Sequence, residues 1–491
     1  MNAIFEDVRS IKIKVSDLAG MPGDFCEAHA VDEDGFVTIT TDYPDYRPFM
    51  IYAENTEARK ELFLCFHSRA YPKNEDVLKK MIARRQELAR LLGYDSWADY
   101  VMEDKMIKTS SAVQNFIDAI DAQARIPAQR DYDALLAEKR LMYPDATEVE
   151  EFEKSFWEER AKRRNFNFDS LAVRAYFEYN KVQDGLLALT EELFGISYQR
   201  VDDAVVWHSS VDVFDVFRAE KNIGRIYLDM HPRVYKYKHA AQFTLQSGVA
   251  GIQLPEGVLV CNFSDPSTSS PALMDHDQVT TFFHEFGHLL HHILGGAQEF
   301  IYFSGVATER DFVEAPSKFF EEWEMDAATL KRFAHHTETH EQIPTGLVEC
   351  MRAADEFGKG LFVRRQMVFA ALSLHCYNRR ATDPEISVHD LGVLDQTQYG
   401  QFPHTEGTYH ECSFGHLDGY SAIYYTYMWS LVIAKDLLSK FPDHDMMNEV
   451  ETRAYARSIL EPGGSKDAAD LVKDFLGREY SFDAFNTWLA T

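Results

Sequence analysis

The sequence lacks the features of a membrane-spanning, secreted or disulfide-bonded protein. No uninterrupted apolar stretch approaches the ~18 residues that a spanning helix requires. The first residues, MNAIFEDVRS, have neither the basic region nor the apolar region of a signal peptide. The six cysteines are scattered and form no Cys-x-x-Cys pair, which favours reduced thiols. We therefore expect a soluble, cytoplasmic protein that has no membrane partner.

Positive charge is also scarce. Lysine and arginine number 50 against 79 aspartates and glutamates, a formal net charge of −29. This balance disfavours nucleic acid and anionic membrane surfaces as partners. Low-complexity tracts and Pro/Ser/Gly linkers are absent, and 45% hydrophobic residues suffice for a large core. Although 491 residues are enough for about three domains, we predict one folded unit over residues 1–491.

Apolar periodicity predicts a mainly helical chain with one small β-sheet. Helices are expected after Asn74 as far as Gly93, from Thr109 or Ser110 onwards, and after Asn180 as far as Gly195. The pattern changes to alternation between Val201 and Phe263. There we predict a hairpin of residues 212–218 and 224–229 and a further strand over Val258–Phe263.

The segment His284-Glu-Phe-Gly-His288 directly follows this region and has the spacing of a zinc site. Two imidazoles four residues apart share one face of a helix, so both reach one Zn²⁺ at roughly 2.0–2.1 Å. Asp275 or Asp277 can cap that helix, and Gly295 can end it. Glu285 is then placed to take a proton from a water activated by the ion. The alternative interpretation is a pair of core histidines.

A catalytic zinc needs a third protein ligand, and Glu314 is the strongest candidate, 26 residues after His288. Pro316 suits the first turn of a second helix that carries this carboxylate. His291 lies about 10 Å along the axis from His284, so His291 and the adjacent His292 are expected to pack or to support the ligands. Glu321 could orient a ligand histidine, or be an ordinary surface or core carboxylate.

The motifs together resemble the thimet oligopeptidase, neurolysin and oligopeptidase A family of zinc peptidases. The zinc motif is followed by Phe303-Ser-Gly305 and by the run Glu309-Arg-Asp-Phe-Val-Glu-Ala-Pro-Ser317. Further similar segments extend nearly from end to end: Leu91-Leu-Gly-Tyr94, Tyr227-Leu-Asp229, Phe414-Gly-His-Leu417 and Ile459-Leu-Glu-Pro-Gly-Gly-Ser465. The resemblance implies one Zn²⁺ per chain, held by His284, His288 and Glu314, with Glu285 as general base.

The resemblance also implies a multi-helical, zincin-type fold with a substrate cleft. We expect residues 1–200 to form a helical lobe that makes one wall of the cleft. Residues 201–491 are expected to form the small sheet and the zinc-binding lobe. The chain starts well into the family pattern and lacks the usual N-terminal helices. We therefore expect a shallower or wider channel, unless a partner subunit supplies the wall; monomer and dimer both stay open.

Tyrosines near the C-terminus are candidates for stabilising the transition state. Tyr420, Tyr424 and Tyr427 follow i, i+4, i+7 spacing, so a helix would project all three phenols the same way. Composition alone favours an aromatic core stripe. The resemblance instead makes Tyr420 and Tyr427 donors to the oxyanion or the substrate and makes His416 a further polar contact, with Tyr424 ranked lower.

Two further features concern the substrate. The strand Val258–Phe263 could accept a peptide as an added strand, or be an ordinary internal strand. Arg310 could bind a substrate carboxylate, although a structural salt bridge is favoured. We predict a zinc-dependent oligopeptidase that cleaves internal bonds of short peptides. The alternatives are a peptidyl-dipeptidase that releases C-terminal dipeptides, and a catalytically inert peptide-binding protein.

Overall fold

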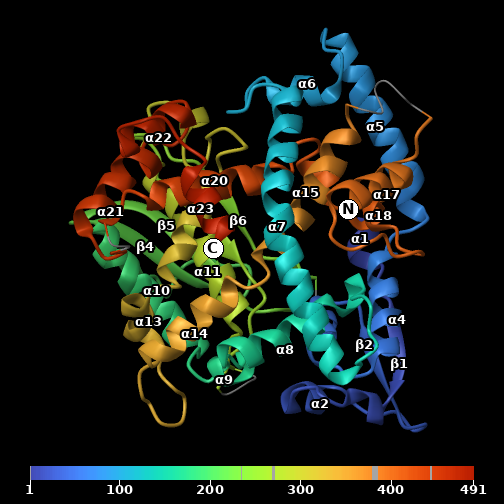
Figure 1. Cartoon of the computed structure of the whole chain (residues 1–491). Helices are drawn as coiled ribbons and strands as arrows, with labels where there is room; N and C mark the ends of the chain where they lie inside the picture. Colours follow the sequence, from blue (N-terminus) through green and yellow to red (C-terminus); the bar gives the residue numbers. More distant parts are fainter. Residues whose placement is uncertain (1, 234, 268–270, 379–384, 443–444) are drawn as a thin grey trace. The chain divides into compact units, whose positions relative to one another are not determined.

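A computed structural model describes residues 2–233, 235–267, 271–378, 385–442 and 445–491. The chain is mainly helical, as predicted, and its described residues form two small sheets where one was expected (Figure 1). It forms two compact units, each built from two stretches of sequence. Unit 1 contains Met1–Asn167 and Asp355–Tyr425, and unit 2 contains Phe168–Ala354 and Thr426–Thr491. The division into a lobe of residues 1–200 and a lobe of residues 201–491 stays a prediction. So does the expectation that they act as one catalytic unit. None of the described helices has the length and apolarity needed to cross a membrane.

In the described part of unit 1, strands β1 (Ser10–Lys14) and β2 (Phe36–Thr40) form an antiparallel pair, and the other regular elements are helices. The long helix α7 packs along α15. The N-terminal stretch contains α1 (Asn2–Glu6), β1 (Ser10–Lys14), η1 (Val15–Leu18), α2 (Gly23–Ala28), β2 (Phe36–Thr40), α3 (Tyr43–Tyr52), α4 (Thr56–His67), α5 (Lys73–Leu91), α6 (Trp97–Met102), α7 (Ser110–Met142), η2 (Glu151–Glu153) and α8 (Lys154–Phe166). The second stretch contains α15 (Lys359–His375), α17 (Val388–Tyr399), α18 (His410–Ser413) and α19 (His416–Gly419).

Unit 2 combines a five-stranded sheet with helices. Its first stretch contains α9 (Ser170–Arg174), α10 (Tyr179–Phe194), β3 (Ser197–Arg200), β4 (Asp212–Arg218), β5 (Lys221–Asp229), β6 (Ala241–Gln246), β7 (Glu256–Val260), α11 (His276–Leu294), η3 (Ile301–Phe303), α12 (Glu314–Phe320), η4 (Glu321–Trp323), α13 (Ala327–Phe333) and α14 (Thr345–Asp355). The second contains α20 (Thr426–Leu438), α21 (Glu449–Tyr455), the π-helical turn η6 (Ala456–Leu460), α22 (Ala468–Leu476) and α23 (Asp483–Ala490).

The predicted helix starts need small corrections, although the helices themselves are confirmed. Helix α5 begins at Lys73, so Asn74 lies inside it, where its side-chain amide donates to the carbonyl of Cys412. Helix α10 is capped by the Glu178 carboxylate, which accepts two backbone N–H groups, and not by Asn180. Thr109 caps α7 as expected, because its hydroxyl accepts the N–H of Ala112.

The strands of unit 2 lie in the order β3-β4-β5-β7-β6. The β4–β5 hairpin is confirmed, with β5 starting already at Lys221. Strand β7 ends at Val260 and is paired on both sides, parallel to β5 and antiparallel to β6. Of the two roles left open for this strand, the ordinary internal strand is confirmed, and acceptance of a peptide along β7 is wrong, because a central strand has no free edge. The edge beside β7 belongs to β6, and β3 forms the opposite edge.

Helix α11 packs against this sheet, and one glycine makes the contact close. A Cβ atom at Gly257 on β7 would lie 2.7 Å from a methyl group of Leu289 on α11. His292 adds a polar link, since its Nε2 lies 3.1 Å from the carbonyl of Gln246 and 3.0 Å from that of Glu256. The helix is thus fixed to the two strands β6 and β7.

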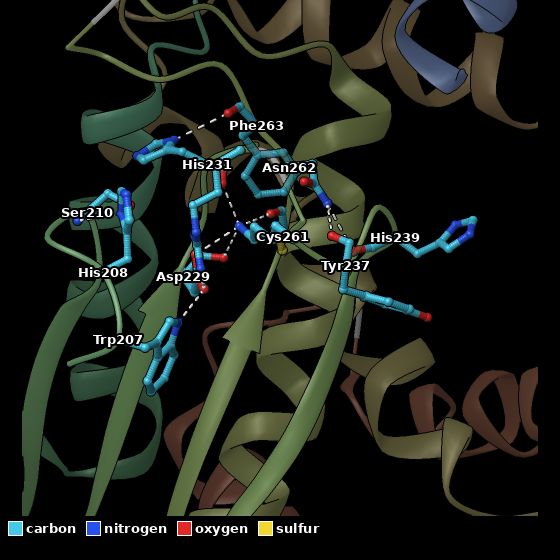
Figure 2. Close-up of polar contacts among 12 residues, drawn as sticks. Trp207, His208, Ser210, Asp229, His231, Tyr237, His239, Cys261, Asn262 and Phe263 are labelled. Atoms are coloured by element: carbon cyan, nitrogen blue, oxygen red, sulfur yellow. Dashed lines mark hydrogen bonds and ion pairs between the residues drawn. The ribbon is translucent and has the colours of Figure 1, made fainter. Parts of the chain in front are cut away.

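A buried cation, Lys236, joins the ends of β5 and β7. Figure 2 labels the residues that it binds, Asp229, His231 and Cys261. The Lys236 ammonium donates to the carbonyls of Asp229, His231 and Cys261 at 2.6–2.8 Å and lies 2.9 Å from the Asp229 carboxylate. Burial would raise the pKa of Asp229, but hydrogen bonds from Arg233, Trp207 and Lys236 hold it well below its usual range. These contacts, named here the Lys236 cluster, fix the connection between β5 and β6.

Asn262, just after β7, holds the same connection at a second place (Figure 2). Its side-chain amide donates to the carbonyl of Tyr237 at 3.0 Å and to that of His239 at 3.1 Å. Both acceptors lie just before Ala241, where β6 begins. The position of the edge strand therefore depends on side chains from the ends of two neighbouring strands.

We expect Lys236→Met to lower the free energy of unfolding by about 3–5 kcal/mol, because it leaves buried carbonyls and part of the Asp229 charge without a partner. Urea unfolding followed by circular dichroism measures this loss. Lys221→Met, at the exposed start of β5, is the matched control. Equal unfolding midpoints for the two variants would contradict the stabilising role given to the Lys236 cluster.

Candidate metal centre

The helix that carries the zinc motif forms for local reasons. Asp275 and Gln278 make a capping box at its start, and Gly295 follows its last residue. Apolar side chains along α11 are buried: Val279, Phe282, Phe283, Phe286, Leu289, Leu290, Ile293 and Leu294. His284 and His288 lie on the same side, with ring centroids 5.0 Å apart. The predicted helix and its two histidines are confirmed.

The carboxylate of Glu314 completes a three-atom donor set. Its Oε2 lies 3.2 Å from Nε2 of His284 and 3.0 Å from Nε2 of His288. Ligands at about 2.0–2.1 Å from a tetrahedral zinc are roughly 3.4 Å apart, so these separations fit one ion. Among the described residues, this is the group of histidine, cysteine and carboxylate side chains that converges closely enough to hold a metal. Two imidazoles and one carboxylate are also the donors that zinc favours.

Helix α12 brings Glu314 to this position by packing closely on α11. A Cβ atom at Gly287 would lie 3.0 Å from the Cα of Ser317, so only glycine lets the helices approach without a shift. Phe283 stacks on Phe320 with ring centroids 5.5 Å apart. Glu314 is 5% exposed. Burial would raise its pKa, but the neighbouring His288 and His284 keep it well below the usual range.

Glu321 supports the first histidine, which is one of the two roles that the sequence left open. Its Oε1 lies 2.7 Å from Nδ1 of His284 and 2.8 Å from the Lys318 ammonium. Nδ1 therefore donates to Glu321, while Nε2 faces Glu314. Burial opposes protonation of His284, but hydrogen bonds to Glu314 and Glu321 raise its pKa to about 10.

Glu285 is held by the edge strand, a contact that the sequence analysis missed. The backbone N–H of Gln242 on β6 donates to Oε2 of Glu285 at 3.0 Å. In an antiparallel pair, backbone N–H groups point alternately toward the neighbouring strand and away from it. The N–H of Gln242 donates to Glu285 and not to β7, so we assign it to the open edge of β6. The alternation of Phe243 and Leu245 with Gln242, Thr244 and Gln246 was a sequence signal for this strand.

His291 and His292 of α11 lie outside the donor set, as expected. His291 is fully buried, and neither ring nitrogen has a hydrogen-bond partner among the described residues. Burial, with the nearby His288 and His292, lowers the pKa of His291 to about 3. His292 joins the helix to β6 and β7, as described above.

The tyrosine segment does not form the single helix that its spacing predicted. Helix α19 ends at Gly419, and the next helix begins only at Thr426. Ser421 between them has a left-handed backbone with φ of +46°, so Tyr420, Tyr424 and Tyr427 do not share one helical face. Tyr424 is buried, whereas Tyr420 and His416 are half-buried.

Tyr420 and His416 belong to unit 1, whereas Tyr427 lies in the first turn of α20 in unit 2. Helix α20 packs on α12. The Thr426 hydroxyl donates to the carbonyl of Arg310, whose side chain is exposed. The catalytic roles of these residues, and the choice between substrate binding and a salt bridge for Arg310, stay predictions.

Comparison with known proteins places this centre in context. The family model "Peptidase family M3" matches residues 49–491. Oligopeptidase A of Escherichia coli (strain K12) is 30% identical over 96% of this chain and 72% of its own length. Thimet-like oligopeptidase of Dictyostelium discoideum is 30% identical over 98% and 74%. The solved structure "PZ peptidase A with inhibitor 2" superimposes with a TM-score of 0.58 at 12% identity, over 91% of this chain and 69% of that one.

We expect Glu321→Gln to weaken zinc binding about 10- to 100-fold, because an amide orients His284 without the carboxylate charge. Competition with a chromogenic chelator measures the affinity. Glu322→Gln is the matched control, since that neighbouring carboxylate pairs with Lys435 and not with a histidine. Equal affinities of the two variants would show that Glu321 does not tune the site.

Proposed function

This chain belongs to peptidase family M3, and we propose that it is a zinc-dependent oligopeptidase that hydrolyses internal bonds of short peptides. The observation that carries the proposal is the convergence of His284, His288 and Glu314 on one point. A zinc ion bound there supplies Lewis-acid activation of water and of the scissile carbonyl. The remaining steps belong to side chains of the protein.

Glu285 is the proposed general base. It takes a proton from the attacking water as the new C–O bond forms, and gives it to the departing amine nitrogen as the C–N bond breaks. The bond from the Gln242 N–H occupies Oε2, so Oε1 is the oxygen left for the proton. Fixing the carboxylate in advance removes part of the cost of orienting it during the reaction.

Tyr420, Tyr427 and His416 are the proposed donors to the carbonyl oxygen, which gains negative charge as water adds. Neutral donors held in place before the reaction stabilise such charge without reorganising. Support comes from the family membership and from the positions of these residues within its motif. Tyr424 is not included, since its ring is buried among Phe369, Phe414 and His416.

The edge of β6 is the proposed docking edge for the peptide main chain. Its outer backbone groups include the Gln242 N–H that reaches Glu285, so a strand added there would pass the general base. Main-chain hydrogen bonds do not depend on side-chain identity, which suits a broad range of peptides. Physiological location in the cytoplasm and the wider channel both stay predictions.

Changing Glu285 to Gln tests the assignment directly. We expect zinc content to stay at one ion per chain, because Glu285 is not in the donor set. We also expect kcat to fall roughly 10³- to 10⁴-fold. A quenched fluorescent peptide measures turnover, and metal analysis measures zinc. Chelation should abolish activity of the unaltered protein, and added zinc should restore it. Unchanged turnover in the Gln variant would remove Glu285 from the mechanism.

The main alternative is a peptidyl-dipeptidase that removes C-terminal dipeptides. That activity needs a group that binds the terminal carboxylate, for which Arg310 is the candidate. An oligopeptidase that cleaves internal bonds does not need to bind the terminal carboxylate. We therefore expect the free-acid and the C-terminally amidated form of one peptide to be cleaved at rates within about threefold of each other. Mass spectrometry of the fragments also gives the bond cleaved. Loss of cleavage on amidation would favour the dipeptidase, and binding of both peptides without any cleavage would favour an inert peptide-binding protein.

A further inference from the structure

The segment that carries His416 and Tyr420 has little regular structure of its own. Helix α19 contains only four residues, and Ser421 has a left-handed backbone that a non-glycine residue seldom adopts. A helix of four residues leaves its last carbonyls without partners inside the helix. The shape of this segment therefore depends on groups from elsewhere in unit 1.

Arg85 on α5 supplies the first of these groups. Its guanidinium donates to the carbonyl of Leu417 and to that of Asp418, each at 2.6 Å. It also donates to the Tyr377 hydroxyl at 2.5 Å, and that hydroxyl donates to the carbonyl of Leu417 at 3.1 Å. A cation at the C-terminal end of α19 also interacts favourably with the helix dipole.

The guanidinium is itself fixed. It lies 5.4 Å from the ring centroid of Trp97 and 5.5 Å from that of Tyr377. The side chain is 20% exposed, and the Tyr377 ring is 1% exposed. A planar fork packed against two aromatic rings orients its donors more precisely than a flexible ammonium would.

Ser373 on α15 fixes the other end of the segment. Its hydroxyl donates to the carbonyl of Ser421 at 2.6 Å and accepts the backbone N–H of Tyr424 at 3.2 Å. Ser373 is fully buried. One hydroxyl thus binds the carbonyl of Ser421 and the N–H of Tyr424, and it holds the turn that follows Tyr420.

We infer that Arg85, acting with Tyr377, is a positioning residue that sets the backbone of the His416–Tyr420 segment for turnover. The inference rests on the proposed function, in which His416 and Tyr420 are donors. The two rings lie 5.6 Å apart across one turn, so a change in the carbonyl positions of Leu417 and Asp418 moves both. Arg85 touches neither ring in the contacts described, and its effect passes through the backbone.

The test compares Arg85→Ala and Arg85→Lys with Arg84→Ala. Arg84 is the matched control, because it is the adjacent arginine on α5, is 81% exposed and pairs only with Glu87 among the described contacts. We expect Arg85→Ala to lower kcat roughly 10- to 100-fold, the loss typical of a misplaced catalytic group. KM should change less than about threefold, zinc content should not change, and Arg85→Lys should recover part of kcat. Arg84→Ala should match the unaltered protein.

A double-variant comparison separates positioning from plain stabilisation. If Arg85 acts through His416 and Tyr420, Arg85→Ala should lower kcat by a smaller factor when Tyr420 is already Phe than it does in the unaltered protein. Should Arg85→Ala not fold, Tyr377→Phe tests the same contact, because it removes one hydroxyl and keeps the buried ring. Full, independent losses in the double variant, or unchanged kcat in both Arg85→Ala and Tyr377→Phe, would overturn the inference.

The outcomes also distinguish this inference from the proposed function. Normal turnover in Tyr420→Phe and His416→Ala would remove the proposed donors and the inference with them. Reduced turnover in those two variants with normal turnover in Arg85→Ala would leave the proposed function intact and reject the positioning role alone.

Discussion

The structure of the metal centre depends on one carboxylate oxygen that lies between two imidazole nitrogens. Glu314 is almost fully buried, and an isolated buried carboxylate is strongly unfavourable unless it is paired. The Nε2 atoms of His284 and His288 supply that pairing in the chain as it stands. The same three atoms are the ones that a zinc ion requires. A charge that is too costly to bury alone therefore keeps the donor set assembled.

That requirement sets the packing of the surrounding elements. Helices α11 and α12 must approach closely enough for one oxygen to meet two rings, and Gly287 makes that approach possible at Ser317. Glu321 then fixes the proton of His284 on Nδ1. Glu285, the proposed general base, depends on a different element, because the N–H that orients it comes from β6. Strand β6 is placed in turn by the connection that Lys236 and Asn262 hold at the ends of β5 and β7.

The metal centre was predictable from sequence because its information is local. The i, i+4 spacing of His284 and His288 survives in any helix, and Glu321 follows Glu314 by seven residues, close to two helical turns. The contact between Glu285 and Gln242 was not predictable in this way, since a backbone N–H leaves no trace in the residue type. The strand itself had a recognisable alternation, but its pairing with β7 joins segments that are distant in sequence.

The tyrosine segment shows how distant contacts override a local pattern. Spacing of four and three residues between tyrosines favours one helix, yet Ser373 holds Ser421 in a left-handed turn that interrupts it. Lys236 and Arg85 also stabilise irregular backbone in this way. In each case one side chain donates hydrogen bonds to several backbone carbonyls. The hydrogen bonds from Lys236 and Arg85 are charge-assisted and therefore strong. Their acceptors are backbone carbonyls of the segment that they hold. A segment fixed through its carbonyls depends less on its own side chains, which suits the roles proposed for His416 and Tyr420.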